Sequence, residues 1–168
     1  MLRPIDGYHQ DEEGHWVAEL RCGHGQHVRH IPPFWQRPWV LTAEGRAARM
    51  GVELPCPLCD RFEMPAGLAP YERTPELDER SIPASLLDEH ATAPGVWGVI
   101  HVIAGRLRYL VDEPLAAEHL LDPAHPGIVV PEVTHRLIPE GPVRFVVELH
   151  RRPPRAGDPH DEAGPGPT

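Results

Sequence analysis

Three cysteines and one histidine-rich stretch place the strongest constraint on how this chain can fold. The stretch is RCGHGQHVRH, residues 21–30, and the other two cysteines stand in the sequence CPLC at 56–59. Thiolates and imidazoles are the ligands that Zn²⁺ prefers, and four of them close a tetrahedral structural site. These two clusters therefore predict a zinc site that ties together a segment too short to fold around a core of its own.

Four residues are the predicted zinc ligands: Cys22, His24, Cys56 and Cys59. His27 is the main rival to His24, because it also lies within a turn's reach of Cys22. An alternative interpretation makes the CPLC cysteines a redox pair, although such a motif is typical of a βαβ context that this stretch lacks. A closed four-ligand site has no open position, so we expect it to stabilise the fold and not to catalyse.

Composition and charge narrow the class of protein. The net charge is −9 with neutral histidines, which disfavours a nucleic-acid partner because phosphate binding needs a cationic surface. The start, MLRPIDGYHQDEEG, carries acids where a signal peptide needs an apolar core. No apolar run approaches the roughly 18 residues of a membrane span. We therefore expect a cytoplasmic protein with neither a nucleic-acid nor a membrane partner.

The predicted fold class is mostly β in two parts, because 22 prolines and 15 glycines favour short strands and turns over long helices. In the first part, strands are predicted at 5–9 and 16–20, and one short helix at 43–50 after the N-cap Thr42. The whole division is a zinc-ribbon-like module at 1–62, a linker at 63–71, a β-barrel domain at 72–152 and a disordered tail at 153–168.

Strand patterns dominate the second part. Residues 96–103 and 107–111, joined by Ala104-Gly105, predict a β-hairpin. Further strands are predicted at 128–130, 135–138 and 143–149. Short strands at regular spacing with Pro/Gly turns are typical of a sandwich or a small barrel.

A second, open metal site is predicted in this part. Its candidate ligands come from different strands: His90, His101, His135 and Glu148. Two or three imidazoles and a carboxylate form a typical transition-metal site with positions free for water or substrate. Two alternatives stay open, since His101 also fits a hydrogen-bonded core histidine and Glu148 an exposed salt bridge. Four histidines are interpreted as surface residues: His119, His125, His150 and His160.

Sequence motifs in the first part resemble a small, uncharacterised family of bacterial proteins. They include GYHQDEEG, WVAEL, CGHGQHVRH and CPLCD, which together span nearly all of residues 1–60. The resemblance implies a domain and brings no activity with it.

The second part resembles the cupin-type domain of the tellurite-resistance family over about residues 72–150. The matching pieces include EHATAPGVWG, VIHVIAGRLRY, PGIVVPEVTH and GPVRFVVELH. The resemblance implies a cupin-like β-barrel that holds a divalent transition metal (Zn²⁺, Fe²⁺, Ni²⁺ or Mn²⁺) and pairs as a homodimer. The family usually places a basic residue after the threonine, where this chain has Ala93.

The expected function is to bind or sense a small molecule or anion under stress, with the metal as the contact point. The alternative is a cupin-type metal-dependent enzyme: an oxygenase, isomerase or hydrolase. In that enzyme His101 is the candidate acid or base, because a histidine pKa can be set near neutrality. A third possibility is a structural or interaction module with one real metal site.

Overall fold

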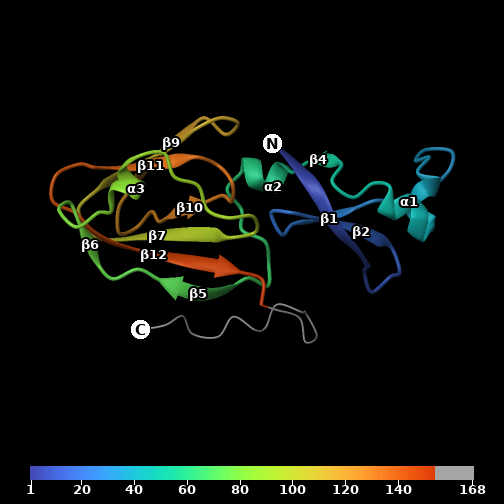
Figure 1. Cartoon of the computed structure of the whole chain (residues 1–168), viewed down its shortest axis with the longest axis horizontal. Coiled ribbons are helices and arrows are strands. Elements are labelled where there is room, and N and C mark those ends of the chain that lie inside the picture. Colours follow the sequence, from blue (N-terminus) through green and yellow to red (C-terminus); the bar gives the residue numbers. More distant parts are fainter. Residues whose placement is uncertain (154–168) are drawn as a thin grey trace.

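The computed structural model describes residues 1–153, and most of its regular structure is β-strand (Figure 1). Its strands form three sheets: one of four strands in the N-terminal part, and one of five and one of three in the C-terminal part. The mostly-β prediction is confirmed. These sheets are open, so the cupin-like barrel stays a prediction. None of the helices in residues 1–153 is long and apolar enough to cross a membrane.

The N-terminal sheet is built on a hairpin whose strands follow the alternation of the sequence. β1 (Leu2–Gln10) pairs antiparallel with β2 (Trp16–Leu20), and the two short strands β3 (Gly25–His27) and β4 (Glu53–Pro55) flank them. Both predicted strands are confirmed. The turn is closed by the Asp11 carboxylate, which accepts hydrogen bonds from the backbone N–H groups of Glu13 and His15.

The helices of this part are short. They are the 3-10 helix η1 (Pro38–Leu41), α1 (Ala43–Ala47) and α2 (Pro57–Asp60). The prediction of one short helix is therefore right for α1, which the Thr42 hydroxyl caps by accepting from Gly45 N at 3.0 Å. It missed the single helical turn of α2, which lies inside the CPLC motif.

The C-terminal part consists of two sheets and one helical turn, α3 (Ala84–Leu87). The strands of the five-stranded sheet are β5 (Ala69–Arg73), β6 (Leu77–Asp78), β7 (Trp97–Ala104), β10 (Gly127–Val129) and β12 (Arg144–Arg151). Those of the three-stranded sheet are β8 (Leu107–Val111), β9 (Ala117–Leu121) and β11 (His135–Pro139). β5, in the five-stranded sheet, begins within the predicted linker at 63–71. The predicted tail lies outside the described residues from 154 onward.

The predicted hairpin at Ala104-Gly105 is wrong. β7 pairs with β10 and β12, whereas β8 pairs with β9 and β11, so the turn carries the chain from one sheet to the other. Gly105 has φ 81°, and a Cβ there would lie 2.2 Å from the carbonyl oxygen of Pro142. Only glycine fits this crossing, because the backbone passes so close. The hairpin of this region is β8–β9.

The core lies between the two C-terminal sheets and continues into the N-terminal part. Its largest fully buried side chains include Trp97, Tyr109 and Phe145. The Tyr109 hydroxyl, on the three-stranded sheet, donates to the carbonyl of Ile128 on the other sheet at 3.2 Å. Burial therefore brings the faces of the two sheets together and leaves a polar cross-link between them.

Two buried side chains join the N-terminal part to the C-terminal part. The Trp97 indole N–H, at the start of β7, donates to the carbonyl of Cys22 at 2.7 Å. The Arg3 guanidinium, on β1, donates to the Pro131 carbonyl at 2.6 Å and contacts the Glu132 carboxylate at 3.1 Å. Trp97 is fully buried and Arg3 nearly so. The two parts thus share one packed junction.

We expect Trp97→Phe to lower the free energy of unfolding by about 1–3 kcal/mol, because it leaves the buried Cys22 carbonyl without its donor. Urea unfolding followed by circular dichroism measures this. The matched control is Trp35→Phe, since Trp35 is 55% exposed. Equal effects of the two variants would contradict the importance of the junction.

Candidate metal centre

Two local turns bring the four predicted zinc ligands together. Cys22 follows β2, and Gly23 at φ 92° turns the chain so that the Leu20 N–H donates to the His24 carbonyl at 2.8 Å. Cys56 immediately precedes α2 and Cys59 lies within it, so one helical turn presents both thiols on the same side. All four side chains are buried.

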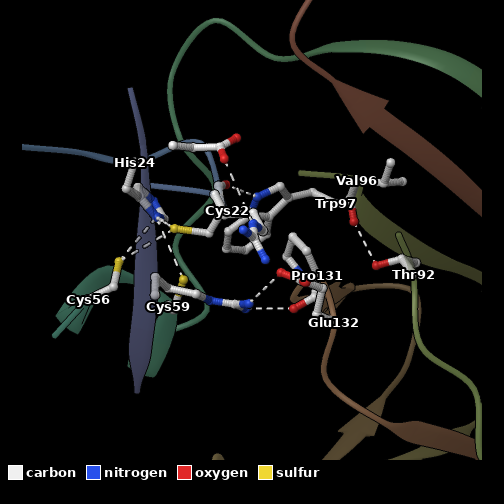
Figure 2. Close-up of polar contacts among 12 residues, drawn as sticks. Cys22, His24, Cys56, Cys59, Thr92, Val96, Trp97, Pro131 and Glu132 are labelled. Carbon is white, nitrogen blue, oxygen red and sulfur yellow. Dashed lines mark hydrogen bonds and ion pairs between the residues drawn. The ribbon is translucent and has the colours of Figure 1, made fainter. Parts of the chain in front are cut away.

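The distances among the four side chains fit tetrahedral zinc coordination (Figure 2). The His24 Nδ1 atom lies 3.4 Å from the sulfur atoms of Cys22 and Cys56 and 3.7 Å from that of Cys59. The sulfur atoms of Cys22 and Cys56 are 3.8 Å apart. Zinc bonds of about 2.3 Å to sulfur and about 2.0–2.1 Å to nitrogen place tetrahedral ligands about 3.8 Å (S to S) and about 3.6 Å (S to N) apart.

Crowding of the thiols perturbs their ionisation. Hydrogen bonds from the thiols of Cys22 and Cys59 lower the pKa of Cys56, and the same close contacts, with burial, raise the pKa of Cys59. Burial by itself would lower the pKa of His24, but its contacts with Cys22 and Cys56 outweigh this and raise the pKa to about 9. A dication supplies the charge that lets all three thiols ionise together and leaves the imidazole neutral.

The orientation of His24 also suits a ligand. Its Nδ1 atom points at the sulfur atoms, while Nε2 is buried without a hydrogen-bond partner in the described part of the chain. The Trp97 ring packs edge-to-face against the imidazole with centroids 5.5 Å apart. Trp97 therefore fixes the ring of this candidate ligand and joins the two parts at the same point.

His27, the rival ligand, lies elsewhere. Its side chain is half exposed, and its Nε2 atom is 2.9 Å from the Asp11 carboxylate. The structure thus assembles Cys22, His24, Cys56 and Cys59, the set that the sequence favoured. In residues 1–153, these four form the one group of three or more Cys, His, Asp or Glu side chains with ligand atoms within 4.8 Å of one another.

Of the second predicted set, the structure brings together His90 and His135. Their backbones exchange two hydrogen bonds of 3.0 and 2.8 Å, and their ring centroids are 5.5 Å apart. His135 is buried, which lowers its pKa and keeps it neutral, and its Nδ1–H donates to the Val133 carbonyl at 3.0 Å. This hydrogen bond leaves the Nε2 lone pair of His135 available as a ligand.

His101 and Glu148 do not join this pair. His101 faces Val146 and Glu148 faces Val99 across the β7–β12 ladder, on the side opposite to the buried residues Ile100 and Phe145. His101 is exposed, and the Glu148 carboxylate lies 2.9 Å from the His150 imidazole. The contact of Glu148 with His150 matches the alternative interpretation of Glu148 as a salt-bridge residue, and the structure brings together two of the four candidate ligands, His90 and His135.

One histidine was misjudged from the sequence. His119 was interpreted as a surface residue, but it is half-buried on β9, with ring centroids 5.8 Å from Tyr109 and 4.7 Å from Phe62. The pattern Ala117, His119, Leu121 alternates inward, and that signal was available in the sequence. Of the other three, His125 is exposed, His150 contacts Glu148, and His160 lies outside the described residues.

Comparisons with known families agree with both resemblances. Residues 6–63 match a family described as a protein of unknown function (DUF3565), and residues 72–147 match the TehB-like domain. The C-terminal part therefore contains a TehB-like domain. No curated protein sequence matches the chain.

Eight chains of solved structures are similar to this one, and two of them show the extent of the likeness. A protein from Escherichia coli K12 has a TM-score of 0.50 and 22% identity, covering 55% of this chain and 98% of that one. TehB from Haemophilus influenzae has a TM-score of 0.48 and 23% identity, covering 52% of this chain and 32% of that one. The chain thus spans about a third of TehB, and the likeness to the E. coli protein shows the fold alone.

We expect the purified chain to contain one zinc ion, and His24→Ala to lose it while His27→Ala retains it. Mass spectrometry of metal content measures this on both variants. Removal of zinc from the wild type with a chelator should lower its stability by several kcal/mol, because a metal that the unfolded chain does not hold stabilises the fold by its binding energy. Zinc retained by His24→Ala would show that another residue completes the site.

Proposed function

We propose that the chain is a zinc-stabilised binding protein of the tellurite-resistance type, whose TehB-like domain holds a small molecule or anion at a divalent transition metal on His90 and His135. The observation that carries the proposal is the pairing of these two histidines. Their bridged backbones hold the rings edge to face with centroids 5.5 Å apart, and the neutral His135 keeps a free Nε2 lone pair. Two imidazoles leave a metal open positions for an anion.

The chain departs from the tellurite-resistance family at the position after Thr92, where the family usually has a basic residue. The residue there is Ala93, so no side chain at that position neutralises an anion. A dication on the histidine pair supplies the charge instead. We infer from the TehB-like match that this binding serves resistance to toxic oxyanions.

The zinc module supports the same site through the loops that carry it. Arg3 holds Pro131 and Glu132, a few residues before His135. The backbone N–H of Glu132 donates to Thr92 O at 3.0 Å, two residues after His90. The Thr92 hydroxyl donates to the Val96 carbonyl at 2.7 Å, next to Trp97 (Figure 2). The module thereby fixes the positions of both histidine-bearing segments.

We further propose that the C-terminal part has a cupin-type arrangement around this metal. Inward-facing Tyr109 touches the rings of both His119 and His135 at centroid distances of 5.8 and 5.5 Å. These contacts line the inner face of the three-stranded sheet with aromatic rings beside the proposed metal. Cupins likewise place their metal on an inner face.

The test compares His90→Ala with the wild type and with His125→Ala, whose side chain is exposed at a turn. We expect the wild type and His125→Ala to bind a second metal equivalent from added Ni²⁺ and then to bind tellurite, measured by metal analysis and calorimetry. His90→Ala should bind neither the second metal nor tellurite. It should keep its structural zinc, because His90 is far from the cysteines in the sequence and its described contacts are with His135.

The same three proteins, expressed in tellurite-sensitive bacteria, test the biological setting. The wild type and His125→Ala should raise the tellurite concentration that allows growth, and His90→Ala should not. Tellurite binding or tolerance that is unchanged in His90→Ala would contradict the proposed site.

A further inference from the structure

The loop between β3 and η1 exposes an apolar tip that no part of the function above uses. The tip, residues 31–35, is Ile-Pro-Pro-Phe-Trp, and Leu41 lies beside Ile31 on the wall of a shared surface pocket. Phe34 is 84% exposed, and Ile31, Trp35 and Leu41 are 46%, 55% and 61% exposed. Four large apolar side chains gathered at one place on a surface mark an interaction site.

The backbone of this tip is poor in free donors. Ile31 and Trp35 exchange both backbone hydrogen bonds, at 2.9 and 2.8 Å, and so close the loop at its base. Pro32 and Pro33 have no N–H. Within the tip, only the N–H of Phe34 stays outside this internal pairing. A segment that enters an apolar phase must satisfy its backbone N–H and C=O groups, and this loop leaves only one N–H to be satisfied.

The segment that carries the tip is cationic, whereas the β1–β2 turn, which contains Asp11, Glu12 and Glu13, leads into Gly14 and His15 on the wall of the same pocket. Residues 28–50 carry four arginines against one glutamate, although the whole chain has a net charge of −9. Arg29 is exposed two residues before the tip, and the Arg37 guanidinium lies 5.3 Å from the centre of the Trp35 ring. The tip is thus a cluster of apolar side chains bordered by cations, at the α1 end of the molecule (Figure 1).

We propose that this tip docks on an anionic lipid surface, with Phe34 and Trp35 entering the interface and Arg29 and Arg37 contacting the phosphates. Aromatic residues concentrate at membrane interfaces, and arginines near them contribute attraction to anionic lipids. Single-stranded nucleic acid also binds arginine and aromatic side chains, but the aliphatic Ile31 and Leu41 offer no ring for bases to stack on.

The proposal does not depend on the metal of the TehB-like domain. It departs from the expectation of no membrane partner, which was based on the lack of a spanning segment. A peripheral contact needs no such segment, because a few apolar side chains and cations suffice for reversible binding.

Sedimentation with vesicles tests the proposal on the full-length, zinc-loaded protein. We expect binding to phosphatidylcholine vesicles that contain about one third phosphatidylglycerol, and weaker binding to pure phosphatidylcholine, with affinity falling as salt is added. Phe34→Ser/Trp35→Ser should reduce binding at least about tenfold, since it removes most of the exposed apolar surface. Arg29→Gln should reduce it about fivefold, as expected for one arginine near an anionic surface.

Leu120→Ser is the matched control, because Leu120 is a similarly exposed leucine (48%) on β9 in the other part of the molecule. It should bind vesicles like the wild type. Lack of binding to the anionic vesicles, or equal binding of the double variant and the wild type, would overturn the proposal. So would concentration-dependent self-association in lipid-free solution that the double variant abolishes, because the tip would then be a contact between copies of this chain.

Discussion

The structure depends on one electrostatic constraint: three thiols and an imidazole meet at a buried point. Their ligand atoms lie within 4.8 Å of one another, and no bulk water separates them. Without a cation, burial and mutual repulsion at this distance disfavour the ionisation of all three thiols together. A zinc ion removes this conflict and joins the end of β2 to α2. We therefore expect the folding of the N-terminal module to be coupled to metal binding.

The same point connects the metal to the rest of the molecule. Trp97 packs on His24 and donates to the carbonyl of Cys22, while Arg3 on the neighbouring strand holds the segment that precedes His135. Because both side chains are buried and hydrogen-bonded, the module and the TehB-like domain are one mechanical unit. A metal bound by the four Cys and His side chains would thus also support the geometry of the proposed anion site in the second part.

Local chemistry made much of this predictable. Cys56 and Cys59 share one helical turn, and Gly23 lets Cys22 and a nearby histidine face the same point, so spacing predicted the candidate ligands and left His24 and His27 as the two possible histidines. Alternating side chains placed β1, β2, β8 and most of β12 to within a few residues, and Thr42 marked the start of α1. These features depend on residues that are close in the sequence. The regular geometry of a strand or a helical turn sets the relative directions of their side chains.

Features that depend on distant partners were not predictable in this way. Gly105 indicated a turn, yet only tertiary packing decided that β7 and β8 join different sheets. His101 and His135 look alike in sequence, but strand pairing turns one outward and buries the other. The sequence by itself determined the three cysteine candidates for the metal and most strands, because local spacing and alternation specify them, and it left the choice between His24 and His27 to the tertiary structure. Only the tertiary structure decided strand partners, inward faces and the junction at Trp97, because long-range burial selects among conformations that are locally equivalent.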